Sequence, residues 1–204
     1  MLYVTTLLLN CCIQVIRVAP CPEKCTCSSN TNQTHVTCKG RGLTEVPLEF
    51  PNNTYSMTLY ENGITNIGAN AFQNLSSLRN LDLNRNSIPV IENTTFVSLP
   101  NLSMLKLSYN RINEVKKDYF NGLANIQEIW MDENKLTFVE EGTFMNMNNL
   151  TVLSLDVHCD CSIYLFWNWL KLVGKYESTI QCFNIDGALL TSLPSCFFDK
   201  CNGK

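Results

Sequence analysis

The amino-acid sequence predicts an α/β solenoid, a horseshoe with a concave parallel β-sheet and a disulfide-bonded cap at each end. Two observations lead to this fold class. The first is a repeat, because in the chain of 204 residues an asparagine recurs every 24 positions, at Asn62, Asn86, Asn110 and Asn134. The second is that the cysteines beyond Cys12 form two clusters, one before these repeats and one after them.

The N-terminus is predicted to be a secretory signal peptide, assigned to residues 1–20. Residues 1–16 form an apolar run without charged side chains, and Arg17 ends it. The run is shorter than the ~20 residues of a membrane-spanning helix, but it suits the apolar segment of a signal peptide. No Lys or Arg precedes the run, and cleavage after Ala19 would put Arg17 where a small residue is usual. A buried N-terminal helix or strand is therefore the alternative.

The charge balance argues against nucleic acid as a partner. The formal net charge is -3, and no run of basic residues is longer than the pair Lys116 and Lys117. Nucleic-acid binding usually rests on a basic surface that follows the phosphate backbone. We therefore expect no nucleic-acid partner.

The repeats, assigned to residues 55–157, combine a short strand with an apolar return segment. Apolar residues stand five and three positions before each repeated asparagine and two after it, as in "LRNLDLNRNSI". The L-x-L alternation predicts a strand whose leucine side faces the core. A phenylalanine ten positions after each asparagine predicts a spine on the outer side of the coil, formed by Phe72, Phe96, Phe120 and Phe144. A partial fifth unit follows, with His158 in the position of the asparagine.

The four repeated asparagines are interpreted as core residues rather than ligand contacts. Each follows its strand where the chain turns away, and its amide can bond backbone groups that no neighbouring strand reaches. A single repeat cannot bury its own apolar face, so the repeats stabilise one another by stacking. The two open ends need caps, which gives the cysteine clusters a structural role.

The caps are assigned to residues 21–54 and 158–204. The first cluster has the spacing C-x3-C-x-C-x10-C, and the second has C-x-C-x20-C with further cysteines beyond it. With the pattern L-x-x-L-x-L-x-x-N-x-L between these clusters, residues 21–201 resemble the extracellular leucine-rich repeat family with cysteine-rich flanking modules. Its members include the Slit proteins, the Nogo receptor, platelet glycoprotein Ib and the variable lymphocyte receptors.

The resemblance implies a set of disulfides in the two caps. It implies the pairs Cys21–Cys27, Cys25–Cys38 and Cys159–Cys182. The partner of Cys161 is less certain in the family pattern, and Cys201 is preferred because the last cysteine of the family follows two spaced leucines. Cys196 would then be a free thiol or an intermolecular bridge.

The stretch "HCDC" at residues 158–161 is therefore expected to close the fold rather than to hold a metal. Ligands one residue apart do not match the C-x2–4-C spacing of zinc sites, and the C-x-x-C motif of redox proteins is absent. The family usually places Asn-Pro and a spacer before this motif, whereas "LSLDVHCDC" runs straight into it. Residues 164–173 are interpreted as a helix that covers the last repeat, with Trp167 and Trp169 in the cap core.

The outward side chains of the strands form the candidate binding face, because the core does not fix their identity. These positions are Ser56, Thr58, Tyr60, Glu61, Asn80, Asp82, Asn84, Arg85, Met104, Lys106, Ser108, Tyr109, Glu128, Trp130, Asp132, Glu133, Val152, Ser154, Asp156 and Val157. Aromatic residues and arginine are enriched at binding hot spots, and an exposed Trp gains nothing from solvent. The candidate contacts are Tyr60, Arg85, Met104, Lys106, Tyr109 and Trp130. The alternative is that these aromatics are ordinary strand formers, and the C-cap loop 183–198 is a second candidate surface.

The chain carries six sequons for N-linked glycosylation, which support secretion. They are Asn32, Asn52, Asn74, Asn93, Asn101 and Asn149. None occupies an outward strand position, so glycans on them would leave the concave face bare.

The predicted function is recognition rather than catalysis. We find no motif for a nucleophile, a phosphate loop or a metal, so no enzyme activity, cofactor or metal is expected. The leading hypothesis is an extracellular protein, secreted or displayed on a cell surface, that binds a protein ligand on the concave face in adhesion, signalling or immunity. Binding of a microbial glycan or lipid is the alternative, and a structural matrix role fits less well. The sequence stops at "CNGK", so membrane attachment is expected only through a segment beyond it.

Overall fold

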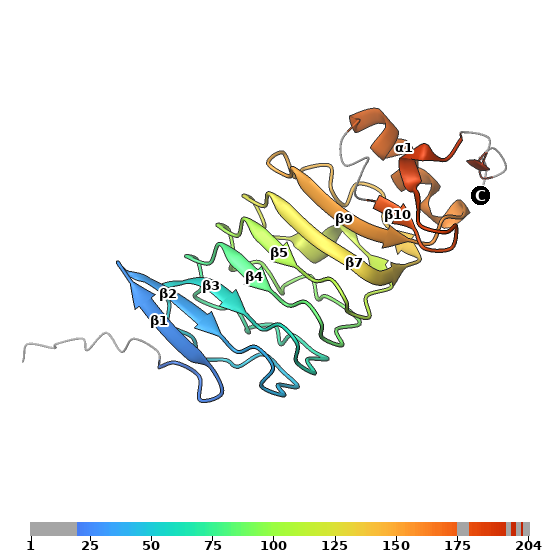
Figure 1. Ribbon diagram of the computed structural model, residues 1–204. Coiled ribbons are helices and arrows are strands. Elements are labelled where there is room, and N and C mark those ends of the chain that lie inside the picture. The colour runs from blue at the N-terminus through green and yellow to red at the C-terminus, as the bar shows by residue number, and fades with distance from the viewer. Residues whose placement is uncertain (1–19, 175–179, 195–196, 199–200, 202–204) are drawn as a thin grey trace, which may run out of the picture.

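The computed structural model describes residues 20–174, 180–194, 197–198 and 201, and it forms a curved stack of coils around one parallel sheet (Figure 1). The sheet has nine strands in the order β1-β2-β3-β4-β5-β7-β9-β10-β11. Residues 1–19 of the expected signal peptide, and Cys196, lie outside the described residues. The predicted solenoid with a parallel sheet and disulfides at both ends is confirmed.

The strands of the sheet follow the repeat. Their bounds are β1 Thr26–Asn30, β2 Gln33–Thr37, β3 Thr54–Thr58, β4 Asn80–Asp82, β5 Met104–Lys106, β7 Glu128–Leu136, β9 Val152–Val157, β10 Ile180–Cys182 and β11 Ala188–Leu189. Equivalent residues pair in register, so that Leu81 faces Leu105, and Leu105 faces Ile129. Only the two end pairs, β1–β2 and β10–β11, are antiparallel within this sheet.

Short elements form the back of the coils and the C-terminal cap. They are β6 Glu114–Val115, β8 Phe138–Val139, the 3-10 helices η1 Lys117–Phe120, η2 Cys161–Ile163 and η3 Leu190–Ser192, and helix α1 Tyr164–Val173. Strands β6 and β8 pair with each other as a small second sheet. In the described part of the chain, no helix has both the length and the apolar character needed to cross a membrane.

The phenylalanine spine is present and continues into the C-cap. The rings of Phe72 and Phe96 stack at 6.2 Å, and those of Phe120 and Phe144 stack at 5.7 Å. Phe144 then contacts the rings of Phe166 at 6.0 Å and Trp169 at 6.1 Å, both on α1. Helix α1 therefore extends the apolar core beyond the last repeat, as predicted.

Gly122 marks a close approach between two coils. A Cβ atom at this position would lie 2.5 Å from Cα of Val97 and 2.6 Å from the carbonyl oxygen of Phe96. Its φ of 92° is also a conformation that side chains disfavour. Only glycine allows the back of the third repeat to pack this closely on the second.

The repeated asparagines form a buried ladder that ties each coil to the coil before it. The side-chain Nδ2 of Asn110 donates to the carbonyl oxygens of Leu107 at 2.9 Å and Leu83 at 3.0 Å. Its Oδ1 accepts from the backbone N–H of Ile88 at 3.1 Å. Asn86 makes the equivalent bonds one repeat earlier. These bonds supply partners for backbone groups in the turn after each strand, as the sequence predicted.

A second, outer asparagine ladder lies in the segments that lead into the strands, and the sequence interpretation missed it. Asn101, Asn125 and Asn149 are also 24 residues apart. Their Nδ2 atoms donate to the carbonyl oxygens of residues 25 positions earlier, namely Ser76, Pro100 and Ala124, at 2.9, 2.9 and 3.5 Å. The spacing was visible in the sequence, but these asparagines lie outside the L-x-L frame that drew attention to the first ladder.

The junction with the C-cap corrects one prediction. Val157 was expected to point outward, but it is fully buried. Val157 pairs with Cys182 of β10 and with Leu136. It does not adopt the left-handed backbone of Glu133 at the same repeat position, so the turn found in the other repeats does not form here. His158 bonds through its backbone instead, with its N–H donating to the carbonyl oxygen of Leu136 at 2.6 Å.

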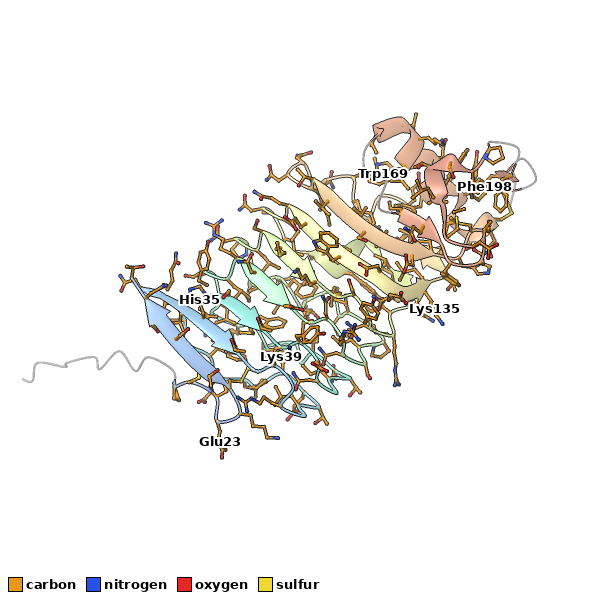
Figure 2. All side chains as sticks on the ribbon, in the orientation of Figure 1. Glu23, His35, Lys39, Lys135, Trp169 and Phe198 are labelled. Atoms are coloured by element: carbon orange, nitrogen blue, oxygen red, sulfur yellow. A yellow bond between two sulfur atoms is a disulfide. The ribbon has the colours of Figure 1, made fainter. Side chains whose placement is uncertain are left out.

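Among the described residues, four disulfides close the two caps. They join Cys21 to Cys27, Cys25 to Cys38, Cys159 to Cys182 and Cys161 to Cys201. These are the pairs that the resemblance implies. Within the C-cap, Trp167 is buried against Phe198 with ring centroids 4.8 Å apart, and Trp169 is half-buried, so both belong to the cap packing (Figure 2).

Candidate binding face

The concave face is built by the outward side chains of parallel strands held in register. Lys106 on β5 pairs with Trp130 on β7, and Trp130 pairs with Ser154 on β9. On the other side Lys106 pairs with Asp82 on β4. Because neighbouring strands in a sheet lie about 4.8 Å apart, these four side chains form one row across the face.

Trp130 lies near the middle of this face. Its indole Nε1 donates to the carboxylate of Glu128 two residues earlier at 3.0 Å, which fixes the ring against its own strand. The side chain is half-buried, with Lys106 and Ser154 beside it and Asp132 next along the strand. A large apolar ring is thus held in place on an open surface.

Arg85 and Tyr109 form a pair at the edge of the face where the strands end. The guanidinium of Arg85 lies 4.4 Å from the ring centroid of Tyr109, and Tyr109 remains 44% exposed. Both residues have left-handed backbones, with φ of 55° and 57°, as do Glu61 and Glu133 in the same repeat position. Such a conformation costs a non-glycine residue about 1 kcal/mol, and the asparagine ladder in the turn stabilises it.

The structure brings some of the candidate contacts together and separates others. Met104, Lys106 and Trp130 lie together on β5 and β7, in the middle of the face. Arg85 and Tyr109 meet at the edge. Tyr60 lies at the N-terminal end, where the Nζ of Lys39 is 4.9 Å from its ring centroid.

Two residues of the face were missed because the N-cap contributes a strand to it. Strand β2 pairs in parallel with β3, so its side chains continue the outward rows. His35 lies on this strand with Nδ1 2.6 Å from Oγ of Ser56, and Lys39 follows it (Figure 2). The alternating "QTHVT" before Cys38 could have indicated this strand.

The charges on the face are unevenly distributed. The outward positions of β3 to β5 balance Glu61 and Asp82 against Arg85 and Lys106. Those of β7 and β9 carry acidic residues and no basic residue, namely Glu128, Asp132, Glu133 and Asp156. The C-terminal half of the face is therefore negatively charged, and Trp130 lies among its acidic residues.

Two of these acidic residues are partly fixed by the repeat. The hydroxyl of Ser108, which was expected to point outward but is buried, donates to Oδ1 of Asp132 at 2.8 Å. Asp156 accepts from the backbone N–H of Glu133 at 2.6 Å. Fixed carboxylates of this kind can meet a partner without first losing side-chain freedom.

The concave face is a broad surface rather than an enclosed pocket. The described residues form a hollow of about 1080 Å³ away from this face. It lies between the N-cap and the first repeat, with Leu48, Phe50 and Gln73 in its wall. The described residues also contain no group of three or more His, Cys, Asp or Glu side chains placed to hold a metal ion. A surface of this shape suits a macromolecular partner better than a small molecule.

Comparison with known proteins identifies the repeat and the N-cap. The profile of the family described as "Leucine rich repeat" matches residues 52–112 and 100–157, and that of "Leucine rich repeat N-terminal domain" matches residues 20–51. Leucine-rich repeat-containing protein 3 of Danio rerio is 41% identical over 85 residues, and that of Homo sapiens is 42% identical over 81 residues. The matched regions cover 42% and 40% of this chain and 32% of each relative. The chain thus spans about a third of the length of these relatives.

Two solved structures resemble the fold. One is a chain of the octameric complex of Latrophilin 3, Unc5D and FLRT2 (LRR), with a TM-score of 0.52 and 25% identity, covering 77% of this chain and 58% of that one. The other is from the TLR13–ssRNA13 complex, with a TM-score of 0.52 and 22% identity, covering 64% of this chain and 18% of that one. At 22% identity, the second likeness concerns the fold alone.

Proposed function

The chain belongs to the leucine-rich repeat family, and on that premise we propose that it is a secreted or cell-surface recognition protein that binds a protein ligand on its concave face. Such binding would serve adhesion, signalling or immune recognition. The N-terminal family module, the disulfide-bonded caps and the likeness to a chain of the Latrophilin 3–Unc5D–FLRT2 complex support an extracellular location.

The proposal divides the chain into four parts with distinct roles. Residues 1–20 direct secretion, residues 21–54 cap the N-terminal end, residues 55–157 present the face, and residues 158–204 cap the C-terminal end. In this scheme both caps serve the face by protecting the open ends of the core.

The observation that carries the proposal is the placement of Trp130. Its ring is oriented by Glu128 and lies in the middle of a sheet face that is mostly polar. Tryptophan is the residue type most often found at the centre of binding hot spots, where a partner removes it from water. Met104 and Lys106 on the neighbouring strand add a flexible apolar group and a charge beside it.

The charge of the face indicates the partner's chemistry. The four carboxylates on the outward positions of β7 and β9 favour a partner segment that presents Lys or Arg side chains around Trp130. Steering by such charges weakens as salt rises, because the Debye length shortens to about 3 Å at 1 M ionic strength. The same charges disfavour the phosphate backbone of nucleic acid, so we retain the expectation that no nucleic acid binds here.

The experiment is a binding screen of the glycoprotein against cell-surface ectodomains, microbial polysaccharides and lipopolysaccharide, and single-stranded RNA. Trp130→Ala is compared with Phe138→Ala, which removes an exposed aromatic ring from β8 in the small second sheet. We expect an ectodomain hit whose affinity falls by about 30-fold in Trp130→Ala, the size of a hot-spot loss of ~2 kcal/mol, and is unchanged in Phe138→Ala.

The other outcomes redirect the proposal. A microbial hit that Trp130→Ala abolishes would replace the protein ligand with a glycan or lipid. An RNA hit would overturn the expectation about nucleic acid. An ectodomain hit that survives Trp130→Ala would move the site away from the concave face, and the C-cap loop beginning at Phe183 would be tested next.

A further inference from the structure

Two edges of the sheet differ in what they carry. We call residues 31–33, 51–53, 74–79, 98–103, 122–127 and 146–151 the strand-start flank, because each segment leads into a strand. We call residues 39–41, 60–63, 84–87, 108–111, 132–135 and 158–160 the strand-end rim. Each segment follows a strand, except 132–135, which form the C-terminal part of the longer strand β7. These segments run along opposite edges of the concave face.

The sequons gather on one of these edges. Five of the six lie on the strand-start flank, and they are Asn32, Asn52, Asn74, Asn101 and Asn149. The sixth, Asn93, lies on the back of the coil between β4 and β5. The strand-end rim contains no sequon.

Four of the flank sequons line two neighbouring hollows. Asn52 and Asn74 line the hollow of about 1080 Å³ between the N-cap and the first repeat. Asn32 and Asn101 line a second hollow of about 260 Å³. Both hollows share Asn53 and Ser77 in their walls, so they adjoin along the flank. Leu48, an apolar side chain that is 72% exposed, forms part of the larger one.

The asparagines on this flank can carry a sugar without losing their structural bonds. Asn101 and Asn149 belong to the outer ladder, in which Nδ2 donates one hydrogen to the coil before it. A side-chain amide has two N–H bonds, and glycosylation replaces only one of them. Asn74 and Asn32 have left-handed backbones, which asparagine tolerates, and both residues are exposed.

We propose that the strand-start flank is a glycan-covered side of the molecule, that the first sugars on Asn52 and Asn74 occupy the larger hollow over Leu48, and that the strand-end rim remains the side from which a protein reaches Trp130. The last clause rests on the proposed function. The reaction is the transfer of an oligosaccharide from its lipid diphosphate carrier in the secretory pathway. The glycosyl–phosphate bond and one Nδ2–H bond break, the N-glycosidic bond forms, and the lipid diphosphate leaves with the proton.

The strand-end rim has the features of an accessible edge. Arg85 and Tyr109 stack there, and Arg111 and Lys135 are exposed further along it (Lys135 is labelled in Figure 2). A glycan on this edge would block the approach to the strands from the rim, just as the flank glycans block the approach from the opposite edge. The absence of sequons from the rim leaves the rows of the face open from this side.

The first test is glycopeptide mass spectrometry on the protein secreted from animal cells. We expect most copies to carry a glycan at each of the five flank sites. Occupancy of fewer than three of these five sites would overturn the proposal. This measurement needs no ligand, so it stands or falls independently of the proposed function.

The second test measures access with nanobodies selected from a synthetic library against the enzymatically deglycosylated protein. Clones are sorted by loss of binding to Arg79→Glu on the flank, to Arg111→Glu on the rim, or to Trp130→Ala on the face. All three residues are solvent-accessible in the structure. We expect flank clones to bind the glycoprotein at least about 100-fold more weakly, and rim and face clones to bind it within about twofold, because a bulky glycan blocks only its own side.

Two variants then add a sequon, one on the rim and one on the flank. Arg85→Asn creates a sequon on the rim, because Ser87 stands two positions after it. Gln127→Thr completes a sequon on the flank that begins at Asn125, in register with those at Asn101 and Asn149. The double variant Arg85→Asn with Ser87→Ala has the same loss of Arg85 but no sequon. We expect rim and face clones to lose binding to the Arg85→Asn variant. We expect them to keep binding to both the double variant and Gln127→Thr.

The contrary outcomes are clear. Flank clones that bind the glycoprotein as well as its deglycosylated form would show that the flank is not covered. Face clones that no longer bind Gln127→Thr but still bind Arg85→Asn would show that Trp130 is reached from the flank. Either result would refute the assignment of the two edges, whether or not a natural protein ligand is found.

Discussion

The junctions inside the repeat region and the junction with the C-cap are built differently. Within the repeat region, the buried side-chain amides of Asn86, Asn110 and Asn134 each donate and accept hydrogen bonds that join two coils. At the last junction His158 takes that position, and its ring lies near Asp160 and Phe183 instead of in the ladder. Asn184 bridges from the other side, accepting from the N–H of Cys159 at 2.7 Å and donating to its carbonyl oxygen at 3.2 Å.

The difference shows how a solenoid ends. An interior coil has a similar neighbour on each side, so one buried amide can repeat the same bonds. The last coil faces a cap of different shape, and its strand β9 continues to pair with β10. A disulfide, a cap asparagine and an extended strand together replace one side chain of the ladder.

The largest expected effect comes from breaking an interior junction. Asn110→Ala would leave the carbonyl oxygens of Leu83 and Leu107 and the N–H of Ile88 without this partner in a buried site. We expect the free energy of unfolding to fall by about 4 kcal/mol, because each buried polar group left unpaired costs about 1–3 kcal/mol. Urea unfolding followed by tryptophan fluorescence measures this.

The matched control for this change is Asn125→Ala in the outer ladder. Asn125 makes one side-chain bond, to the carbonyl oxygen of Pro100, at an exposed position. Its loss should cost less than about 1 kcal/mol. Equal effects of the two variants would mean that the inner ladder is no more important than a surface bond.

The second expected effect comes from the cap's covalent link. Replacing Cys159 and Cys182 by Ala removes a disulfide that closes a sequence separation of 23 residues. The loss of stability should be about 3 kcal/mol, and larger than for the Cys21–Cys27 pair, because a longer closed loop restricts the unfolded chain more. A smaller effect at the C-cap than at the N-cap would contradict the role given to this bridge.

The sequence could predict what the repeat imposes. The inner asparagine ladder, the strands and the phenylalanine spine each recur at one position in every unit, so each was visible as a column. The four disulfides followed from the family resemblance and not from the repeat. The proximity of Arg85 and Tyr109 could also have been predicted from the sequence, because they occupy the same position in adjacent repeats.

The sequence could not predict features that depend on non-repeating neighbours. Val157 is buried because β10, from a different part of the chain, pairs with it, and no column indicates that pairing. The alternation of "QTHVT" could have indicated a strand, but not that this strand pairs with β3 and so brings His35 and Lys39 to the face. The uneven charge of the face was present in the sequence, but its meaning depends on the strands lying side by side.

A smaller effect is expected from the cap asparagine, and it sharpens the comparison. Asn184→Ala removes both bonds to Cys159, which are partly buried, and should cost about 1.5 kcal/mol. His158→Asn restores the ladder residue at the last junction, yet stability should change by less than about 0.5 kcal/mol because β9 does not turn there. A gain of more than about 1 kcal/mol would mean that an asparagine at this position can still bridge to the coil before it.

Another small effect is expected as a pH dependence of stability at the start of the C-cap helices. Burial raises the pKa of Asp160, but hydrogen bonds from the hydroxyl and backbone N–H of Ser162, with the attraction of His158, outweigh it and leave the pKa below its usual value of 3.8. The carboxylate caps η2, which leads into α1, by accepting from the Ser162 N–H at 2.8 Å. A lowered pKa in the folded state means that this contribution is present above the unfolded pKa and is lost as the pH falls through the folded value.

Asp160→Asn should therefore unfold more easily than the native protein at neutral pH, by less than about 1 kcal/mol because the carboxylate is half-exposed and screened by solvent. As the pH falls through the lowered folded pKa, the native carboxyl becomes protonated, and the difference between the two proteins should disappear. Urea midpoints measured from pH 7 to pH 2.5 would show this convergence. A difference that stays constant over this range would mean that the side chain stabilises the cap by its shape and not by its charge. The last junction would then not depend on this charge.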